Sequence, residues 1–307
     1  MPKILTVTFN PAIDKSTTIK ALAPEKKLRC TQPKFEAGGG GLNVARAITR
    51  LGGDATALFP AGGYSGKFLV ELMKRERVPV VTVETQHHTR ENLIVLDTSS
   101  NNQYRFGMPG SEILQAEWEQ LLDTIRGFGA DFIVASGSLS PGIPDDIFGH
   151  IAGIAKSQHA RLVVDTSGEA LKKAADVGVY MLKPNLGELS SLVGKEEVTH
   201  EEVNGIAREI ISGGGAEVIV VSMGGSGARL VTKDEVHHVT PPVVKRQSTV
   251  GAGDSMVAGM VLSVAKGWDM KKVLQYGVAA GTAATMNPGT ELCRPEDTER
   301  LFRIIQA

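Results

Sequence analysis

The stretch Val218-Ile219-Val220-Val221 consists of four β-branched residues in a row, and Met223-Gly224-Gly225 follows two positions later. A strand with one face in water would alternate apolar and polar residues, so this run predicts a central strand that is covered on both sides. A helix-period segment, Glu201–Ile211, stands before it. Strands and helices that alternate at this spacing indicate a mostly parallel sheet with helices on both faces.

The same alternation extends over most of the chain and predicts the α/β fold class. The expected strands are Ile4–Phe9, Ala55–Phe59, Phe132–Ala135, Leu162–Asp165, Met181–Lys183 and Val218–Ser222. The expected helices are Leu42–Leu51, Gly66–Arg77, Gln115–Ile125, Pro144–Lys156, Glu188–Val193, Glu201–Ile211, Gly253–Lys266, Met270–Met286 and Pro295–Ile305.

Two polar, β-prone stretches, Lys15–Glu36 and Glu91–Phe106, interrupt the alternation. Together they predict a small second sheet that projects as a lid, formed by about residues 14–36 and 88–108, from a single domain that covers residues 1–307. A small sheet on its own is marginal in water and needs a partner surface. A second subunit is the simplest source of that surface, so we expect a homodimer through the lid.

The composition excludes several classes of function. The 33 basic and 34 acidic residues give a net charge of −1 without a basic stripe, which argues against nucleic acid as a partner. Cys30 and Cys293 are far apart and lack CxxC spacing, which argues against disulfides or zinc and fits a reducing compartment. We see no signal peptide and no apolar run near the about 18 residues that cross a bilayer. These features predict a cytoplasmic protein.

A first glycine-rich cluster, Gly38-Gly39-Gly40-Gly41-Leu42-Asn43, directly precedes the helix that contains Val44–Ile48. Four glycines allow a close approach of the backbone and present N–H groups at a helix start. Asn43 adds an amide that can both donate to and accept from sugar hydroxyls. The cluster therefore predicts a ligand site, and a flexible turn is the alternative.

A second cluster, Val250-Gly251-Ala252-Gly253-Asp254, opens a helix with small residues and places an acid in the first turn. Phosphoryl transfer to a hydroxyl needs donors aimed at the transferring group and a carboxylate that accepts the hydroxyl proton. The N–H groups of Gly251, Ala252 and Gly253 can supply the donors, and Asp254 can supply the carboxylate. Alternatively, Asp254 only stabilises the helix dipole.

A third cluster, Gly224-Gly225-Ser226-Gly227, follows the expected strand Val218–Ser222. Ligands of open α/β sheets bind at the carboxyl ends of parallel strands, so nucleotide phosphates could bind here; a strand-to-hairpin turn is the alternative. Gly62–Phe68 is a false P-loop, because Ala61 replaces the first glycine and Lys67 lacks a following Ser or Thr. No GxGxxG follows the first strand, which argues against a dinucleotide-dependent oxidoreductase.

The order of these clusters resembles the ribokinase-type sugar kinase family over essentially the whole chain. The resemblance is carried by the Gly38–Ala47 loop and helix, Ser136–Leu139, Lys183-Pro184-Asn185 with Glu188, and Gln247–Ser255. It implies a ribokinase-like three-layer α/β/α fold with a small β-sheet lid. It also implies that Asp254 is the catalytic base and that Gly251, Ala252 and Gly253 form the anion hole.

The resemblance further implies a sugar-phosphate site. Asp14 and the loop with Gly38, Gly39, Gly40 and Asn43 look like the site for the sugar hydroxyls. Arg90 looks like the clamp on a phosphate already present on the substrate, with Ser138 beside it, because arginine recognises phosphates through two parallel hydrogen bonds. Lys27 and Arg29 on the lid could reach the phosphates of the nucleotide and the sugar across a dimer interface, or could be solvated surface cations.

For the cofactors, the resemblance implies ATP, Mg²⁺ and a monovalent cation, K⁺. Glu188 would hold Mg²⁺ through water, since this ion gives up its hydration reluctantly. The residues implied for the nucleotide are Lys183, Asn185, Glu188, Ser222, Gly224 and Gly227, and those for K⁺ are Ser248, Val250, Ala284, Asn287 and Gly289.

Three positions depart from the family pattern. Many relatives carry Asp where Ser248 stands, and Ser140 replaces a more usual Pro. Glu291 occupies a place where the most similar relatives have a basic residue, which puts the cation site in more doubt than the catalytic one.

We therefore expect transfer of the ATP γ-phosphoryl group to the hydroxyl at carbon 1 of fructose 6-phosphate, a glycolytic reaction that gives fructose 1,6-bisphosphate. Tagatose 6-phosphate and fructose 1-phosphate remain alternative substrates within the same family. From a different class, the rival is the dinucleotide-dependent oxidoreductase, for which the GxGxxG is missing. A third option is a non-catalytic nucleotide- or sugar-sensing protein with this fold, although the intact Gly-Ala-Gly-Asp motif argues against it.

Overall fold

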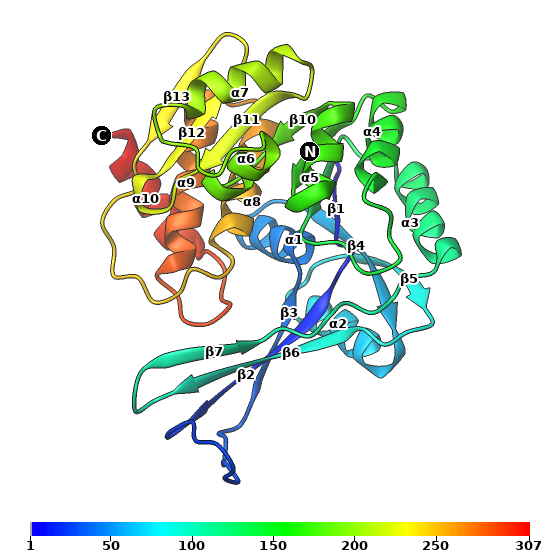
Figure 1. The fold of residues 1–307 in the computed structure, drawn as a ribbon, viewed down its shortest axis with the longest axis vertical. Coiled ribbons are helices and arrows are strands. Elements are labelled where there is room, and N and C mark those ends of the chain that lie inside the picture. The colour runs from blue at the N-terminus through cyan, green and yellow to red at the C-terminus, as the bar shows by residue number, and fades with distance from the viewer. Residues whose placement is uncertain (1) are drawn as a thin grey trace.

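The centre of the molecule is a nine-stranded sheet with the order β13-β12-β11-β10-β9-β8-β1-β4-β5, seen in a computed structural model that describes residues 2–307 (Figure 1). Neighbouring strands from β5 to β11 are parallel, and β12 and β13 form an antiparallel edge. The bounds are β1 Ile4–Val7, β4 Ala55–Gly62, β5 Val80–Thr85, β8 Phe132–Ser136, β9 Arg161–Asp165, β10 Val179–Leu182, β11 Ala216–Ser222, β12 Ala228–Val231 and β13 Val236–Val239.

Helices cover both faces of this sheet, so the parallel strands have no face in water. In β1, Ile4 packs with the core under one helical layer and Leu5 with the core under the other. The first layer contains α1 Gly40–Arg50, α2 Gly63–Arg75, α8 Ala252–Ala265, α9 Met270–Thr285 and α10 Pro295–Gln306. The second contains α3 Gln115–Phe128, α4 Ile147–Ser157, α5 Gly168–Val177, α6 Leu186–Leu192 and α7 Val203–Ser212.

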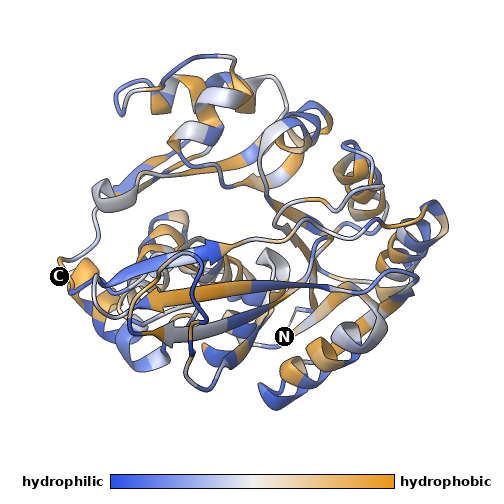
Figure 2. Cartoon of the chain, turned by 60° about the horizontal axis from the view of Figure 1, so that its bottom comes forward, coloured by the Kyte–Doolittle hydropathy of each residue, from blue (hydrophilic) through white to orange (hydrophobic). Residues whose placement is uncertain are grey.

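A second, four-stranded sheet projects from this body and has the order β3-β2-β6-β7 (Figure 1). We call it the lid sheet. Figure 2 shows the hydrophobic stretch of β6 flanked by the more hydrophilic β2 and β7. Its strands are β2 Ala12–Ile19, β3 Lys34–Gly38, β6 Arg90–Asp97 and β7 Asn102–Phe106. They fall largely within the two segments expected to form a lid; the division into one domain with a moving lid stays a prediction.

The expected fold class is confirmed, and every expected strand and helix exists with ends shifted by a few residues. The helix expected from Pro144 begins at Ile147, because the chain first makes a turn in which the Ile147 N–H donates to the Pro144 carbonyl. The sequence analysis missed α5 and the strands β5, β12 and β13. Within residues 2–307, no helix is long and apolar enough to cross a membrane.

Candidate active site

Three of the predicted site residues, Ser138, Lys183 and Ser222, lie at the carboxyl ends of the parallel strands, where open α/β sheets bind ligands. Asn10 and Asp165, which were not predicted as site residues, lie there too. Asn10 follows β1, Ser138 follows β8, and Asp165 ends β9. Lys183 follows β10, and Ser222 ends β11. Five neighbouring strands therefore present polar side chains along one edge of the sheet.

The first glycine cluster leads from β3 into α1, and its glycines are required by the protein's own packing. A Cβ on Gly40 would lie 2.3 Å from the Ser136 hydroxyl, and one on Gly41 would lie 2.5 Å from the Val7 carbonyl. Gly39 has a φ of 115°, which disfavours any residue with a side chain. A Cβ on Gly38 would lie 2.6 Å from the Asp14 carboxylate. The sequence predicts that the backbone of this loop approaches another group closely, and in the structure that group is the protein's own chain.

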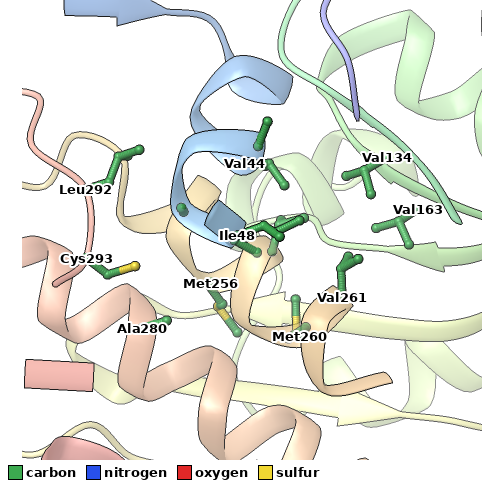
Figure 3. Close-up of a cluster of buried hydrophobic side chains, with 14 of the residues drawn as sticks. Val44, Ile48, Val134, Val163, Met256, Met260, Val261, Ala280, Leu292 and Cys293 are labelled. Carbon is green, nitrogen blue, oxygen red and sulfur yellow. The ribbon is translucent and has the colours of Figure 1, made fainter. Parts of the chain in front are cut away.

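The second glycine cluster lies at the start of α8. The first turn of α8 lies beside the first turn of α1. Gly251 caps α8 in the left-handed conformation, with a φ of 73°. Hydrophobic side chains hold the two helices against the sheet and each other, among them Val44 and Ile48 of α1 and Met260 of α8 (Figure 3). The N–H groups in the first turn of a helix have no partner within the helix. The mouth of α8 therefore presents N–H donors in a fixed position, at the place where the sequence predicts an anion site.

Asp254 lies in the first turn of α8 and contacts the first glycine-rich segment directly. The Asn43 side-chain Nδ2 donates to Asp254 Oδ2 over 2.9 Å. Two motifs separated by about two hundred residues thus meet through one hydrogen bond, as expected if one handles the sugar and the other the phosphoryl group.

Burial raises the pKa of Asp254 from the usual 3.8 to about 6, and the charge of Asp165 adds to the rise. The hydrogen bond from Asn43 and the positive charges of Lys183 and Arg46 oppose it. At neutral pH the carboxylate is still ionised, and its basicity is higher than that of an exposed aspartate. These are the properties of a general base.

Lys183 supplies a buried positive charge beside Asp254. Its Nζ lies 3.1 Å from Asp165 Oδ1, and although burial lowers its pKa, the Asp165 carboxylate raises it overall. Burial and the charge of Asp165 also raise the pKa of Glu188. Glu188 and Asn185 form the capping box of α6, in which Asn185 Oδ1 accepts from the Glu188 N–H. One lysine therefore faces Asp165, Glu188 and Asp254, which leaves an excess of negative charge.

On the lid side, Asp14 and Arg90 lie at the start of β2 and β6, which pair in parallel. Asp14 Oδ1 accepts from Asn92 Nδ2 over 2.9 Å, and burial raises the Asp14 pKa. The Arg90 guanidinium donates to the carbonyls of Asn10 and Met108, each over 3.0 Å. Asn10 Nδ2 in turn donates to Ser138 Oγ over 3.1 Å. The structure thus brings Asp14, Arg90 and Ser138, three of the residues predicted for a sugar phosphate, to one place.

A cleft of about 630 Å³ opens beside the mouth of α8. Its lining includes Ser222, Gly224 and Gly227 from the end of β11 and the turn after it, and Gly253 from α8. The third glycine cluster is also a hairpin turn, since β11 and β12 pair in antiparallel fashion around it, which confirms the turn; nucleotide binding at this cluster stays a prediction. The remaining lining residues were not predicted. Pro241, Val243, Arg246 and Thr249 lie in a loop without regular structure, which gives no periodic signal, and Thr282 lies in α9.

The five residues predicted to hold a monovalent cation also lie together. The Ser248 hydroxyl donates to the Gly289 carbonyl over 2.7 Å and accepts from the Val250 N–H over 3.2 Å. The Asn287 N–H donates to the Ala284 carbonyl over 3.2 Å. Neutral carbonyl and hydroxyl oxygens at one place suit a hard monovalent cation.

Lys27 and Arg29 are not near this site within one chain. Both are exposed, in the segment between β2 and β3 at the end of the lid sheet that points away from the body (Figure 1). Glu291, the unusual acid, lies 3.2 Å from Lys34 of β3 and 3.0 Å from Arg294.

The model of the family described as "pfkB family carbohydrate kinase" matches residues 7–297, which are nearly the whole chain. The chain belongs to the pfkB family. Its relative ATP-dependent 6-phosphofructokinase isozyme 2 from Escherichia coli K12 is 46% identical over 304 residues, which cover 98% of each chain.

Solved structures agree with this placement in the pfkB family. The structure of Escherichia coli phosphofructokinase-2 in complex with potassium has a TM-score of 0.97 and 45% identity, with 100% of both chains covered. The same relative in complex with fructose-6-phosphate has a TM-score of 0.94 and 44% identity over 100% of both chains. A more distant pfkB relative, the 1-phosphofructokinase of Bacillus subtilis, is 30% identical over 94% of this chain and 95% of its own.

Proposed function

We propose that this chain is an ATP-dependent 6-phosphofructokinase, which transfers the γ-phosphoryl group of ATP to the hydroxyl at carbon 1 of fructose 6-phosphate. The Asn43–Asp254 hydrogen bond carries the proposal, because it places a basic carboxylate between a sugar loop and an anion site. The greater identity to a 6-phosphofructokinase, 46%, than to a 1-phosphofructokinase, 30%, favours this substrate.

In this reaction Asp254 accepts the proton of the attacking hydroxyl. Asn43 occupies Oδ2, so Oδ1 is the oxygen available for the proton. The N–H groups of Gly251, Ala252 and Gly253, with the positive end of the α8 dipole, stabilise the charge on the transferring group. Lys183 neutralises the nucleotide phosphates. Catalysis then rests on positioning and electrostatics, as phosphoryl transfer requires.

The substrate's own phosphate would bind Arg90, with Ser138 beside it, and Asp14 and Asn43 would hold the sugar hydroxyls. A neutral-sugar kinase would have no use for the Arg90 charge at this place. The Arg90 hydrogen bonds to two backbone carbonyls fix its guanidinium plane in advance, which reduces the entropy lost on binding.

The nucleotide would lie in the cleft between Gly224 and Gly253, and its phosphates would attract Mg²⁺ to the acids around Lys183. Within residues 2–307, no three His, Cys, Asp or Glu side chains are close enough to hold a metal by themselves. This fits an ion that Glu188 holds through water and that is bound mainly by phosphates. Mg²⁺ would supply charge neutralisation on the phosphates.

A monovalent cation, K⁺, fits the oxygens of Ser248, Val250, Ala284, Asn287 and Gly289, and would rigidify the segment that leads into α8. Glu291 is turned to Lys34 and Arg294, so it does not compete for this place.

The same proposal includes a homodimer and a cytoplasmic location. Three of the large hydrophobic residues exposed on the chain lie in or beside the lid sheet: Leu22, Phe106 and Met108. A partner's lid could cover them and bring a second copy of Lys27 and Arg29 toward the site. The two free cysteines fit a reducing compartment.

An ADP-release assay over a panel of sugars and sugar phosphates, with and without potassium, tests the proposal. Fructose 6-phosphate should give the highest kcat/KM, and potassium should raise it. A higher kcat/KM for fructose 1-phosphate or tagatose 6-phosphate would assign a different substrate within the family, and no ADP release with any of them would overturn the kinase assignment.

A further inference from the structure

Among residues 2–307, Arg46 is the largest of the fully buried side chains, and although it lies within the Gly38–Ala47 segment, it has no role in the proposed site. It lies on α1, three residues after Asn43, and is 1% exposed. A buried guanidinium is costly unless its donors are satisfied. The contacts of Arg46 therefore show what offsets the cost of its burial.

One of these contacts decides how the Asn43 amide is oriented. Arg46 Nη1 donates to Asn43 Oδ1 over 2.9 Å and to the Ala37 carbonyl over 2.6 Å. An asparagine amide can turn over with little change in shape, so only its hydrogen bonds define which end faces a neighbour. With Oδ1 held by Arg46, the Asn43 Nδ2 donor must face Asp254.

The guanidinium is itself held in place by two acids from different elements. Arg46 Nε donates to Oε1 of Glu76, the residue that directly follows α2, over 2.7 Å. Arg46 Nη2 lies 3.9 Å from Oε1 of Glu36 in β3. Glu36 accepts from the Thr290 hydroxyl over 2.7 Å. Although burial opposes it, Arg46 keeps the pKa of Glu76 below its usual value.

We propose that Arg46 is a positioning residue for phosphoryl transfer, which acts through Asn43 to hold the Asp254 carboxylate with Oδ1 free for the acceptor hydroxyl. This inference rests on the proposed function. Arg46 does not line the nucleotide cleft, and it reaches the base only through Asn43. Its loss should therefore change kcat far more than the KM for ATP.

The chain offers a matched control in Arg50, one turn later on α1. Arg50 Nη2 binds the same Glu76 carboxylate over 2.8 Å, from its Oε2 side, and has no hydrogen bond to Asn43. Arg50→Met thus removes an ion pair to Glu76 and leaves the orientation of Asn43 intact. Arg46→Lys keeps the buried charge near Glu76 but lacks the planar fork with which Nε binds Glu76 while Nη1 binds Asn43. This second variant keeps the test valid if Arg46→Met does not fold.

The experiment measures kcat, KM and the pH profile of kcat for Arg46→Lys, Arg46→Met and Arg50→Met, with fructose 6-phosphate and ATP. The Arg46 variants should lose about 10- to 100-fold in kcat, the loss expected for one hydrogen bond to a charged group. Arg50→Met should keep the wild-type kcat even if its melting temperature falls.

The pH profile separates positioning from a general loss of structure. Burial and the charge of Asp165 raise the pKa of Asp254, while Asn43, Lys183 and Arg46 lower it. Arg46→Met removes the Arg46 charge and weakens the Asn43 hydrogen bond, whereas Arg46→Lys weakens the hydrogen bond alone. The acidic limb of kcat should therefore move to higher pH in both Arg46 variants, further in Arg46→Met, and should not move in Arg50→Met. In an Asp254→Asn background the Arg46→Lys change should have little further effect on kcat.

Three results would overturn the inference: folded Arg46 variants with wild-type kcat and pH profile, equal losses in the Arg46 and Arg50 variants, or a full further loss in the Asp254→Asn background. A wild-type chain without kinase activity would instead overturn the proposed function, so the two failures are distinguishable.

Discussion

The ionised form of Asp254 is needed for catalysis, but it lowers the stability of the fold. Its pKa in the folded chain, about 6, is higher than the 3.8 of an exposed aspartate. The folded state therefore binds this proton more tightly than the unfolded state does. The stability that the neutral carboxyl contributes is complete below pH 3.8 and is lost as the pH rises through about 6, so at neutral pH the ionised base costs stability.

Asp254→Asn removes that cost and the base together. We expect kcat to fall by about 10²–10⁴-fold, the usual contribution of a general base. At pH 8 we expect the free energy of unfolding to rise by about 1–2 kcal/mol, because no charge remains to be desolvated. Steady-state kinetics and thermal melts at pH 5 and pH 8 check both. Near-normal turnover, or a variant less stable than wild type at pH 8, would contradict this account of Asp254.

A second prediction at this scale concerns Arg90 and the charge of the substrate. Arg90→Ala should raise the KM for fructose 6-phosphate by about 100-fold, as expected when one partner of a buried charge pair is removed. The KM for ATP should stay within a factor of about two, since Arg90 lies outside the nucleotide cleft. An unchanged KM for the sugar phosphate would point to a neutral sugar.

At the scale of elements, the start of α8 combines two glycines that have different roles. Gly251 needs its left-handed φ of 73°, and a Cβ there would lie 2.6 Å from Leu292 Cδ2. Gly253 has helical backbone, and the nearest atom to a Cβ would be Lys183 Nζ at 3.6 Å. The first glycine is required by the fold, whereas the second leaves space open where we place the transferring phosphoryl group.

Alanine at each position should separate these roles. Gly251→Ala should destabilise the chain by about 1–2 kcal/mol, the cost of a left-handed non-glycine residue. Gly253→Ala should leave stability unchanged or raise it by up to about 1 kcal/mol, and should lower kcat strongly because the methyl group fills the anion site. Melting temperatures and kcat of both variants check this. Gly253→Ala with full activity would mean that the phosphoryl group does not bind at this helix start.

The elements that could be predicted from the sequence are those whose signal is local. The run Val218–Val221 identified a buried central strand, and Gly253-Asp254 identified a helix start with an acid in its first turn. The short strands β12 and β13 were missed because an antiparallel edge of four residues each carries little periodicity. The Arg46–Asn43–Asp254 link was also beyond local reasoning, because it depends on how α1, α2 and α8 pack together.

At the scale of the whole molecule, the lid sheet is the part that we propose a second copy of the chain covers. It projects from the body, exposes Leu22, Phe106 and Met108, and carries Lys27 and Arg29 at its far end (Figure 1). Burial of such apolar side chains against a second copy would gain about 25 cal/mol for each Å² covered. The same contact would enclose the sugar site, which limits the access of water during transfer.

The dimer can be tested by charges placed on the lid, with matched changes elsewhere as the control. The double variant Leu22→Asp with Phe106→Asp should convert the protein from twice the chain mass to the chain mass in light scattering, because each buried carboxylate would be desolvated at the interface. Val177→Asp with Ile304→Asp alters side chains that are at least as exposed, on α5 and α10, and should leave the mass unchanged. The monomeric form should also show a higher KM for fructose 6-phosphate, since its sugar site would stay open to water. If both double variants keep the wild-type mass, or if the wild-type chain is itself monomeric, the lid is not the interface, and Lys27 and Arg29 are then solvated cations with no part in the site.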